Sequence, residues 1–404
     1  MDGRVVVVGG CGHVGLPLAI VSALSGCPTT ILDVDSEALA MVERGRMPFM
    51  EEGAEPLLRQ VLETGQLSLS RDPSVIADCA LVILVIGTPV NEFLAPRLDV
   101  VIRTLEEYEP HFRKGQTLIL RSTVYPGVSS RVQRYFQRRG LDVDVAFCPE
   151  RVAQGRLIQE LKELPQIISA FSDRGLAAAR AFFDRFAPST VVLEPLEAEL
   201  AKLFSNAYRY IQFATANQFY VIAEGKGLDY DRIYRAMTVD YPRLRGLPGP
   251  GFAAGPCLLK DTLQLAAYSR QTFSLGLAAV WVNEGLPEFI VEQAGHRCDL
   301  DTATVGILGM AFKPEVDDIR DSLSYKLRRL LTLEARRVLC HDPYVKDPSF
   351  SDLDTLVRES DLLIVATPHS AYRLLEIPAA KIVIDPWHFL AASGLRSAAG
   401  GSAE

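Results

Sequence analysis

A cysteine, a lysine and an aspartate stand close together in the stretch "GPCLLKD", Gly255–Asp261, and these residue types can support nucleophilic chemistry. The glycine and proline predict that a helix begins at "CLLKD", which puts Cys257 and Asp261 one turn apart. A helix N-terminus favours a thiolate, and a carboxylate one turn later can activate water or accept a proton. A buried, inert cysteine at the start of a helix fits the same residues equally well.

The stretch "ELAKLFSNAY" carries a second candidate pair, Lys202 and Asn206, which are four residues apart and share one face of a helix. A lysine fixed beside an amide can stabilise an alkoxide as the ammonium, or accept a proton as the neutral amine when burial disfavours the charged form. Taken by itself, the pair fits a solvated surface lysine better than a catalytic one.

A glycine-rich loop follows the first apolar stretch, with Gly10, Gly12 and Gly15 in GxGxxG spacing. Glycines in such a loop allow a tight turn and the close approach of a pyrophosphate, which the N-terminus of the next helix attracts. Asp33 follows 18 residues after Gly15, where a carboxylate binds ribose hydroxyls and repels a 2′-phosphate. The loop therefore predicts NAD binding, and purely structural glycines are the alternative. The predicted cofactor contacts in the loop are Gly10, Gly12, His13, Val14 and Gly15.

Two further short motifs, "GTP" at 87–89 and "STVYPG" at 122–127, stand at the ends of predicted strands. Ligands bind at the carboxyl edge of an open α/β sheet, so Thr88 and Thr123 are candidates for cofactor contacts. Proline and glycine also favour ordinary turns, which is the alternative interpretation of both motifs.

The elements that must position these residues follow a regular order. Strands and helices alternate over residues 1 to about 195, which is typical of a parallel sheet covered on both faces. The clearest strands are "RVVVVG", "PTTILDVD", "ALVILVIGTP", "TLILRSTV" and "DVAFCPE". Residues 197–227 lack proline and repeat apolar residues at three- and four-residue spacing, which predicts one long helix.

More helix is expected to about residue 298, and the β/α alternation restarts at Asp301. The strands expected there are "TATVGILGMAF", "ARRVLCHDP", "DLLIVATP" and "KIVIDPW". The predicted fold class is α/β, with two Rossmann-like parallel-sheet domains joined by a long central helix and a helical middle region. The predicted domains are residues 1–196, 197–298 and 299–404.

Composition narrows the classes of function. The 404 residues are 48% hydrophobic and 23% charged, as in ordinary globular proteins. A net charge of -8 argues against a nucleic-acid partner, because phosphate binding needs clustered Lys and Arg. The sequence shows no signal-peptide pattern and no apolar run of the roughly 20 residues of a membrane span, which predicts a cytoplasmic protein. Seven cysteines without a CxxC pair and six scattered histidines predict no metal site.

Seven segments occur in the order and approximate spacing of one enzyme family: "GGCGHVGLP", "GTP", "STVYPG", "CPERV", "ELAKLFSNAY", "GPCLLKD" and "LGMAFKPEVDDIRDS". On these segments, the chain resembles the UDP-glucose/GDP-mannose dehydrogenase family over nearly its whole length. The resemblance implies a four-electron oxidation, in which the C6 alcohol of a nucleotide sugar becomes a carboxylate at the expense of two NAD. It also implies that 1–196 bind NAD, 197–298 form a dimerisation domain and 299–404 bind the UDP-sugar.

The resemblance assigns the family's catalytic positions to Thr123, Glu150, Lys202, Asn206, Cys257 and Asp261. The implied chemistry needs these residue types, because an aldehyde cannot donate a second hydride until a nucleophile adds. Cys257 would supply that nucleophile and pass through a thiohemiacetal to a thioester, which water then hydrolyses. Lys202 and Asn206 would stabilise the oxyanions, and the other three residues would position or deprotonate the water.

The implied substrate contacts are Glu150, Arg151, Lys202, Asn206, Arg243 and Lys313. Lys313 in "AFKPE" matches a position near the sugar phosphate, and Arg320 in "DIRDS" matches one that reaches toward the cofactor. Arg243 in "YPRLRG" matches an arginine that reaches the substrate across a dimer interface. The resemblance therefore implies a homodimer with the long helix at its interface.

Some positions depart from the family pattern and bear on the choice of sugar. The loop "CPERVAQG" is closer to members that oxidise N-acetylated UDP-hexosamines than to UDP-glucose enzymes, which usually carry a second glutamate where Gln154 stands. Ala253, Ala254 and Pro256 replace the glycines and the small or polar residue of many relatives, which is expected to alter the pocket. UDP-N-acetylmannosamine is the expected substrate, with UDP-glucose and UDP-N-acetylglucosamine left open.

Two other functions compete with this interpretation. A two-electron dehydrogenase of the hydroxyacid or 6-phosphogluconate type also joins a Rossmann domain to a long helix, but it needs no nucleophilic cysteine and no second β/α domain. Cys257 and residues 301–390 argue against it. A non-catalytic nucleotide-sugar sensor would be expected to lose Cys257, Lys202 or Asp261, and all three are present.

Overall fold

A computed structural model describes residues 3–88, 97 and 99–390 of the chain. Its contacts divide the protein into two compact units, of which the first contains Met1–Ser205 and Leu263–Gln271. The second unit contains Asn206–Thr262 and Thr272–Glu404. The predicted domain boundaries after residues 196 and 298 stay predictions.

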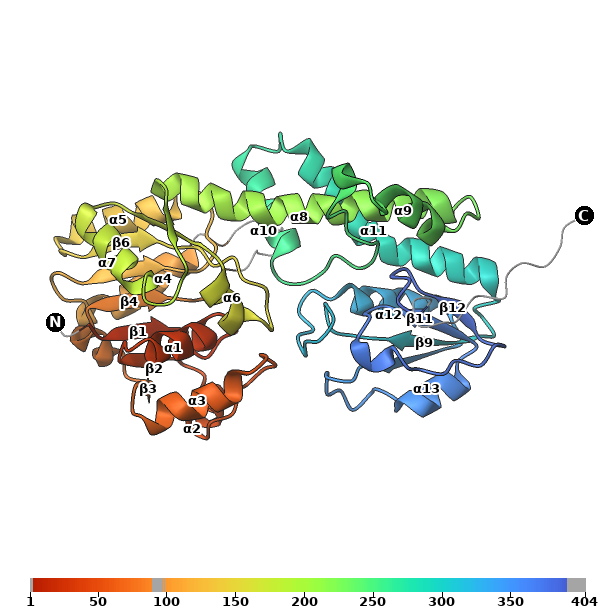
Figure 1. The fold of residues 1–404 in the computed structure, drawn as a ribbon, viewed down its shortest axis with the longest axis horizontal. Coiled ribbons are helices and arrows are strands. Elements are labelled where there is room, and N and C mark those ends of the chain that lie inside the picture. Colours follow the sequence, from red (N-terminus) through yellow and green to blue (C-terminus); the bar gives the residue numbers. More distant parts are fainter. Residues whose placement is uncertain (1–2, 89–96, 98, 391–404) are drawn as a thin grey trace, which may run out of the picture. The chain divides into compact units, whose positions relative to one another are not determined.

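The first unit is built on a sheet in which eight strands are described, in the order β3-β2-β1-β4-β5-β6-β7-β8 (Figure 1). Neighbouring strands are parallel except β6 and β7, which are antiparallel. The strands are β1 (Val5–Val8), β2 (Thr29–Leu32), β3 (Leu67–Ser70), β4 (Leu81–Leu84), β5 (Thr117–Leu120), β6 (Asp144–Phe147), β7 (Gln166–Ala170) and β8 (Thr190–Val192). The chain reverses its winding direction between β1 and β4, which is the ligand-binding point of a doubly wound sheet.

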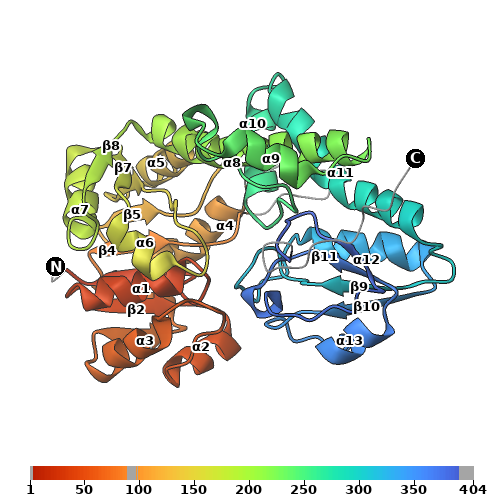
Figure 2. The ribbon, with the colours of Figure 1, turned by 45° about the vertical axis from the view of Figure 1, so that its right-hand side comes forward.

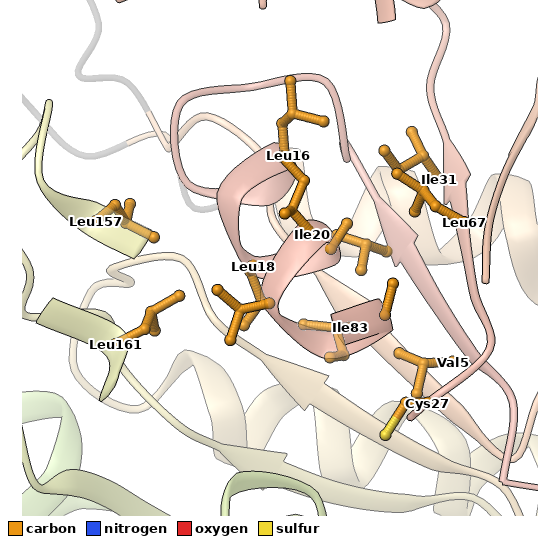
Figure 3. Packing of buried hydrophobic residues seen from close by; sticks show 14 of the residues in the cluster. Val5, Leu16, Leu18, Ile20, Cys27, Ile31, Leu67, Ile83, Leu157 and Leu161 are labelled. Carbon is orange, nitrogen blue, oxygen red and sulfur yellow. The ribbon is translucent and has the colours of Figure 1, made fainter. Parts of the chain in front are cut away.

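Helices cover both faces of this sheet because its strands are apolar on both sides. In β1, Val5 and Val7 belong to one core cluster, whereas Val6 and Val8 belong to the other. The first cluster packs under α1, α3, α6 and α7, and the second under α4 and α5. Figure 3 shows Leu18 of α1 on the side of Leu157 and Leu161 of α6. The helices are α1 (Gly15–Leu24), α2 (Ser36–Glu43), α3 (Ala54–Glu63), α4 (Asp99–Tyr108), α5 (Val128–Arg139), α6 (Leu157–Glu163) and α7 (Asp173–Phe183), with 3-10 turns η1 (Pro73–Asp78) and η2 (Glu109–His111).

The second unit contains a smaller parallel sheet, in the order β10-β9-β11-β12 among the described residues. Figure 2 shows α12 and α13 on opposite sides of it, and the two core clusters of this sheet agree with that arrangement. Its elements are β9 (Thr304–Leu308), α12 (Leu323–Glu334), β10 (Arg337–His341), α13 (Leu353–Glu359), β11 (Leu362–Val365), η4 (Ser370–Tyr372) and β12 (Ile382–Ile384). The prediction of a second parallel-sheet domain is therefore confirmed.

The predicted long helix is α8 (Pro195–Glu224), which begins two residues earlier than expected and ends three residues earlier. Proline at the first helical position fits, because its fixed φ suits a helix and no N–H is needed there. Further helices are α9 (Tyr230–Thr238), η3 (Pro242–Leu244), α10 (Leu258–Tyr268) and α11 (Ser274–Arg297). None of the helices in the described part of the chain has both the length and the apolar character of a membrane span.

Candidate active site

The glycine-rich loop connects β1 to α1, and its glycines serve different purposes. A Cβ atom on Gly10 would lie 2.8 Å from the Val7 carbonyl oxygen, and one on Gly15 would lie 2.5 Å from that of Gly9. Gly12 differs, because the nearest described atom would be 3.6 Å from its Cβ. Space next to Gly12 is therefore open for the close approach of a ligand. Gly9 was not singled out from the sequence, although its φ of +74° and its contact with Val85 also require glycine.

The loop and the end of β2 fit NAD. Among the described residues, no side chain caps the N-terminus of α1 and no acidic residue lies in its first turn, which leaves the helix end suited to a pyrophosphate. The Asp33 carboxylate accepts hydrogen bonds from Cys11 N (2.8 Å) and Asp35 N (3.0 Å), one on each oxygen. Each oxygen has a second lone pair for a ribose hydroxyl. His13 stacks on Phe49, with ring centroids 4.1 Å apart.

The motifs after β4 and β5 are joined to each other. The Ser122 hydroxyl accepts a hydrogen bond from Ile86 N (2.9 Å), and the Thr88 hydroxyl donates to the Thr123 carbonyl (2.6 Å). The structure therefore brings the two candidate threonines together at the carboxyl edge of the sheet. Pro89, the last residue of "GTP", lies outside the described residues.

Glu150 follows β6 and is 8% exposed. One carboxylate oxygen accepts hydrogen bonds from Arg151 N (2.7 Å) and Val152 N (3.0 Å), and the other pairs with the guanidinium of Arg121. Sequence reasoning missed Arg121, which lies within the quoted strand "TLILRSTV" and is fully buried. A charged residue inside an apolar strand was the available signal, because such a residue needs a buried partner. Gln154, later in this loop, is partly buried.

Lys202 and Asn206 are both buried on α8, with 9% and 6% of their surfaces exposed. The interpretation of Lys202 as a solvated surface lysine is therefore wrong. Asn206 Nδ2 donates to Asp261 Oδ2 over 2.6 Å, and Lys260 Nζ lies 2.8 Å from Asp261 Oδ1. Lys260, the lysine of "GPCLLKD", therefore provides a positive charge beside this buried carboxylate.

Cys257 directly precedes α10 and is exposed, so the alternative of a buried cysteine is also wrong. Asp261 N donates to the Cys257 carbonyl (2.9 Å), which confirms the predicted one-turn spacing. The other six cysteines are buried or partly buried, and burial raises the pKa of both Cys11 and Cys148 to about 12. These two thiols are therefore protonated at neutral pH, and Cys257 is the accessible candidate for a nucleophile.

Three predicted basic residues lie in the second unit. Arg320 donates to the Asp318 carboxylate through Nε and Nη2, and this hydrogen bond raises the pKa of Arg320, with the Cys257 thiolate charge acting in the same direction. Lys313 follows β9 and is partly exposed. Arg243 is exposed and stacks over the Tyr241 ring. Its proposed reach across a dimer interface stays a prediction.

The residues before Cys257 that depart from the family pattern pack within the second unit. Ala253 is 3% exposed and belongs to a core cluster with Tyr210, Ala214 and Ala279. Gly255 has a φ of +100°, and a Cβ atom there would lie 2.4 Å from the Phe312 ring. The segment before Cys257 is therefore tightly packed, and an effect of the alanines on the sugar pocket stays a prediction.

Three family models match consecutive parts of the chain. The UDP-glucose/GDP-mannose dehydrogenase NAD binding domain matches residues 4–187, the central domain 196–284 and the UDP binding domain 306–392. Together they span most of the chain.

Individual relatives match over nearly full length. UDP-N-acetyl-D-mannosamine dehydrogenase of Pyrococcus horikoshii is 29% identical, covering 91% of this chain and 90% of the relative. An NDP-N-acetyl-D-galactosaminuronic acid dehydrogenase of Ralstonia solanacearum is 27% identical, and the match covers 95% of this chain and 96% of the relative.

Solved structures of similar enzymes also match the chain over nearly its full length. The UDP-D-ManNAc dehydrogenase from Pyrococcus horikoshii superposes with a TM-score of 0.87 at 27% identity, covering 95% of this chain and 94% of that one. A UDP-glucose dehydrogenase from Pyrobaculum islandicum superposes with a TM-score of 0.88 at 27% identity, and the match covers 96% of this chain and 94% of that one.

Proposed function

Because the chain belongs to the UDP-glucose/GDP-mannose dehydrogenase family, we propose that it oxidises the C6 alcohol of UDP-N-acetyl-D-mannosamine to a carboxylate in four electrons. NAD is the cofactor, since the family's NAD binding domain matches residues 4–187. The observation that carries the proposal is the exposed Cys257 at the start of α10, one turn before the buried Asp261.

The first oxidation needs a group that holds the C6 oxygen while its proton and hydride leave. NAD, when bound, supplies the hydride acceptor. Lys202 and Asn206, both buried on α8, stabilise the developing negative charge on the C6 oxygen. As the hydride leaves C6, the hydroxyl proton passes to Lys202 Nζ in its neutral amine form, and the product of the step is an aldehyde.

The second oxidation begins when the Cys257 thiolate adds to the aldehyde carbon. A C–S bond forms, and the carbonyl π electrons move to oxygen, which takes up a proton to give a thiohemiacetal. Loss of a hydride from carbon and a proton from oxygen then leaves a thioester on Cys257. The position of Cys257 before α10 favours the thiolate, because the helix N-terminus carries partial positive charge.

Hydrolysis completes the reaction. Water bonds to the thioester carbon, the C–S bond breaks, and Cys257 leaves as a thiolate with the electron pair. The water proton passes to a carboxylate, for which Glu150 and Asp261 are the candidates, and Thr123 helps to position the water. Overall, the alcohol loses two hydrides and gains one water oxygen.

The choice of sugar draws on the loop that begins with Glu150 and on the names of several relatives. The loop "CPERVAQG" resembles that of enzymes acting on N-acetylated UDP-hexosamines, and relatives from several archaea are named UDP-N-acetyl-D-mannosamine dehydrogenase. The match of the UDP binding domain to residues 306–392 supports a uridine nucleotide. In this proposal Arg151, Arg243 and Lys313 contact the substrate and Arg320 contacts the cofactor.

The proposal includes a homodimer and a cytoplasmic location. Support for the dimer comes from exposed apolar side chains along α8, where Tyr208, Phe219 and Ile222 are 63%, 39% and 58% exposed. Their spacing places them on one face of the helix, and such a face favours contact with another protein surface.

The testing experiment measures NADH formed per limiting sugar nucleotide, with excess NAD and UDP-N-acetylmannosamine, UDP-N-acetylglucosamine, UDP-glucose or GDP-mannose. We expect two NADH per UDP-N-acetylmannosamine and at most one for Cys257→Ala, because the aldehyde then lacks its nucleophile. The matched control is Cys298→Ala, which changes a partly buried cysteine and should keep the wild-type ratio.

Two outcomes would count against parts of the proposal. One NADH per sugar in the wild-type protein would exclude the thioester route. Two NADH with UDP-glucose and none with the acetamido sugars would keep the route and change the substrate.

A further inference from the structure

Arg121 follows β5 and holds the loop that contains Glu150. Its Nη1 donates to the carbonyls of Cys148 (2.9 Å) and Pro149 (3.2 Å) and to Gln166 Oε1 (2.8 Å). Its Nη2 donates to Glu150 Oε2. A single guanidinium therefore fixes two backbone groups and the carboxylate of the same loop, which a lysine ammonium cannot do with the same planar geometry.

The surroundings of Arg121 keep it in one position. Its guanidinium carbon lies 5.0 Å from the centre of the Phe183 ring, and Gln166 also donates to the Pro149 carbonyl (3.1 Å). Arg121 is 0% exposed, and Glu150 provides the countercharge that a buried cation needs.

The Glu150 carboxylate has four acceptor positions, two on each oxygen. Hydrogen bonds from Arg151 N and Val152 N occupy both positions of Oε1, and Arg121 occupies one on Oε2. Among the described contacts, the fourth position, on Oε2, is unoccupied, and it lies on the oxygen that Arg121 fixes. This is the position in which a water proton can be accepted.

We propose that Arg121 is a positioning residue for the hydrolytic step: it fixes Glu150 Oε2 and leaves the remaining lone pair of that oxygen available for the proton of the attacking water. The inference rests on the proposed function. In the step, the water oxygen bonds to the thioester carbon, the C–S bond breaks, Cys257 leaves as a thiolate and the water proton passes to Oε2. Both hydride transfers precede this step, so loss of Arg121 should slow the hydrolysis more than either hydride transfer.

The test follows single turnovers of Arg121→Lys by stopped flow and by intact-protein mass spectrometry. We expect a rapid burst of two NADH per active site, then turnover slowed by about 10²-fold, as for loss of a positioned acid or base. The mass of the protein should increase by that of the sugar acyl group attached to Cys257. A general loss of folding would lower the burst itself and leave no acyl adduct.

Two further variants make the test decisive. Gln166→Leu removes one hydrogen-bond acceptor from Arg121 without a change in charge, and we expect a smaller build-up of the same adduct. It replaces Arg121→Lys if that variant does not fold. The matched control is Arg174→Lys, since the exposed Arg174 pairs with Asp142 and Asp144 in the same unit and contacts neither Arg121 nor Glu150 in any described ion pair, and we expect no adduct.

Glu150→Gln separates failure of this inference from failure of the proposed function. If Glu150→Gln accumulates the adduct while Arg121→Lys and Gln166→Leu turn over like the wild type, the inference is overturned and the proposed function stands. If Glu150→Gln shows no adduct and Cys257→Ala still forms two NADH, the proposed function itself is overturned.

Discussion

Gly12 and Gly15 belong to the same motif, yet the structure gives them opposite roles. Gly15 is required by the fold, because a Cβ atom there would lie 2.5 Å from the Gly9 carbonyl oxygen. Gly12 has an ordinary φ and open space beside its Cβ position, so nothing described in the protein itself requires glycine there. A ligand that approaches the backbone is the remaining reason for it.

This difference predicts opposite effects of two alanine substitutions. Gly12→Ala should keep the thermal midpoint of the wild type but weaken NAD binding by about tenfold or more, which corresponds to about 1.4 kcal/mol. Gly15→Ala should lower the free energy of unfolding by about 1–3 kcal/mol, because the added methyl group overpacks the loop. Titration with NAD, followed by fluorescence, measures the change in binding, and urea unfolding measures the change in stability. Equal losses of stability in the two variants would contradict the assignment.

At the scale of elements, one carboxylate joins three strand ends of the smaller sheet. Asp342 follows β10 and accepts hydrogen bonds from Met310 N (2.7 Å) and Ala311 N (2.9 Å), which follow β9. His369 follows β11 and donates from Nε2 to Asp342 (3.1 Å), while its Nδ1 accepts from Glu315 N (3.1 Å). The loop that carries Lys313 is therefore held at both of its ends.

These contacts make the stability of the second unit depend on pH. Burial by itself raises the pKa of Asp342, but hydrogen bonds from His369, Ala311 and Val345 outweigh burial and hold the pKa well below its usual range. Because the pKa is lower in the folded than in the unfolded protein, its contribution to stability is present above about pH 4 and lost as pH falls toward the folded value.

Asp342→Asn should therefore lower the free energy of unfolding at pH 7 by about 1.5–3 kcal/mol, as expected for hydrogen bonds to a charged group. The difference from the wild type should shrink below about pH 4. Urea unfolding at several pH values measures this difference in the free energy of unfolding. The matched control is Asp352→Asn, because Asp352 caps α13 at an exposed position and asparagine caps equally well. A deficit in Asp342→Asn that persists unchanged at low pH would rule out this explanation.

At the scale of the whole molecule, exposed apolar side chains concentrate on α8 and on α11, where Trp281 is 78% exposed. Isolated exposed leucines occur elsewhere, such as Leu333 on α12 at 85%. A single exposed leucine is ordinary for a protein surface, whereas a stripe along a 30-residue helix favours association.

If α8 forms the proposed dimer interface, Tyr208→Glu should shift the protein to monomers, because it places a charge on the apolar stripe. Sedimentation velocity at micromolar concentration measures this, with Leu333→Glu as the matched control that should keep the wild-type state. A wild-type protein that sediments as a monomer would end the dimer proposal, and so would a dimer that Tyr208→Glu leaves intact.

Much of the fold and part of the site could be predicted from the sequence, because both depend on local spacing. The apolar run of four valines predicted β1, three- and four-residue apolar spacing predicted α8, and the glycine and proline before Cys257 predicted the start of α10. Periods of two and 3.6 residues fix which side chains share a face, whatever that face later contacts. The direction of β7 did not follow from its sequence, since parallel and antiparallel strands can have the same apolar pattern.

The sequence by itself determined the order of the elements, the glycine loop with Asp33, and the helical spacings of Lys202 with Asn206 and of Cys257 with Asp261. Tertiary structure decided which of these side chains are accessible and which are paired. It left Cys257 exposed, joined Asn206 to Asp261, and buried Arg121 against Glu150. The physical reason is that burial and ion pairing depend on segments distant in the chain, whose contacts no local periodicity specifies.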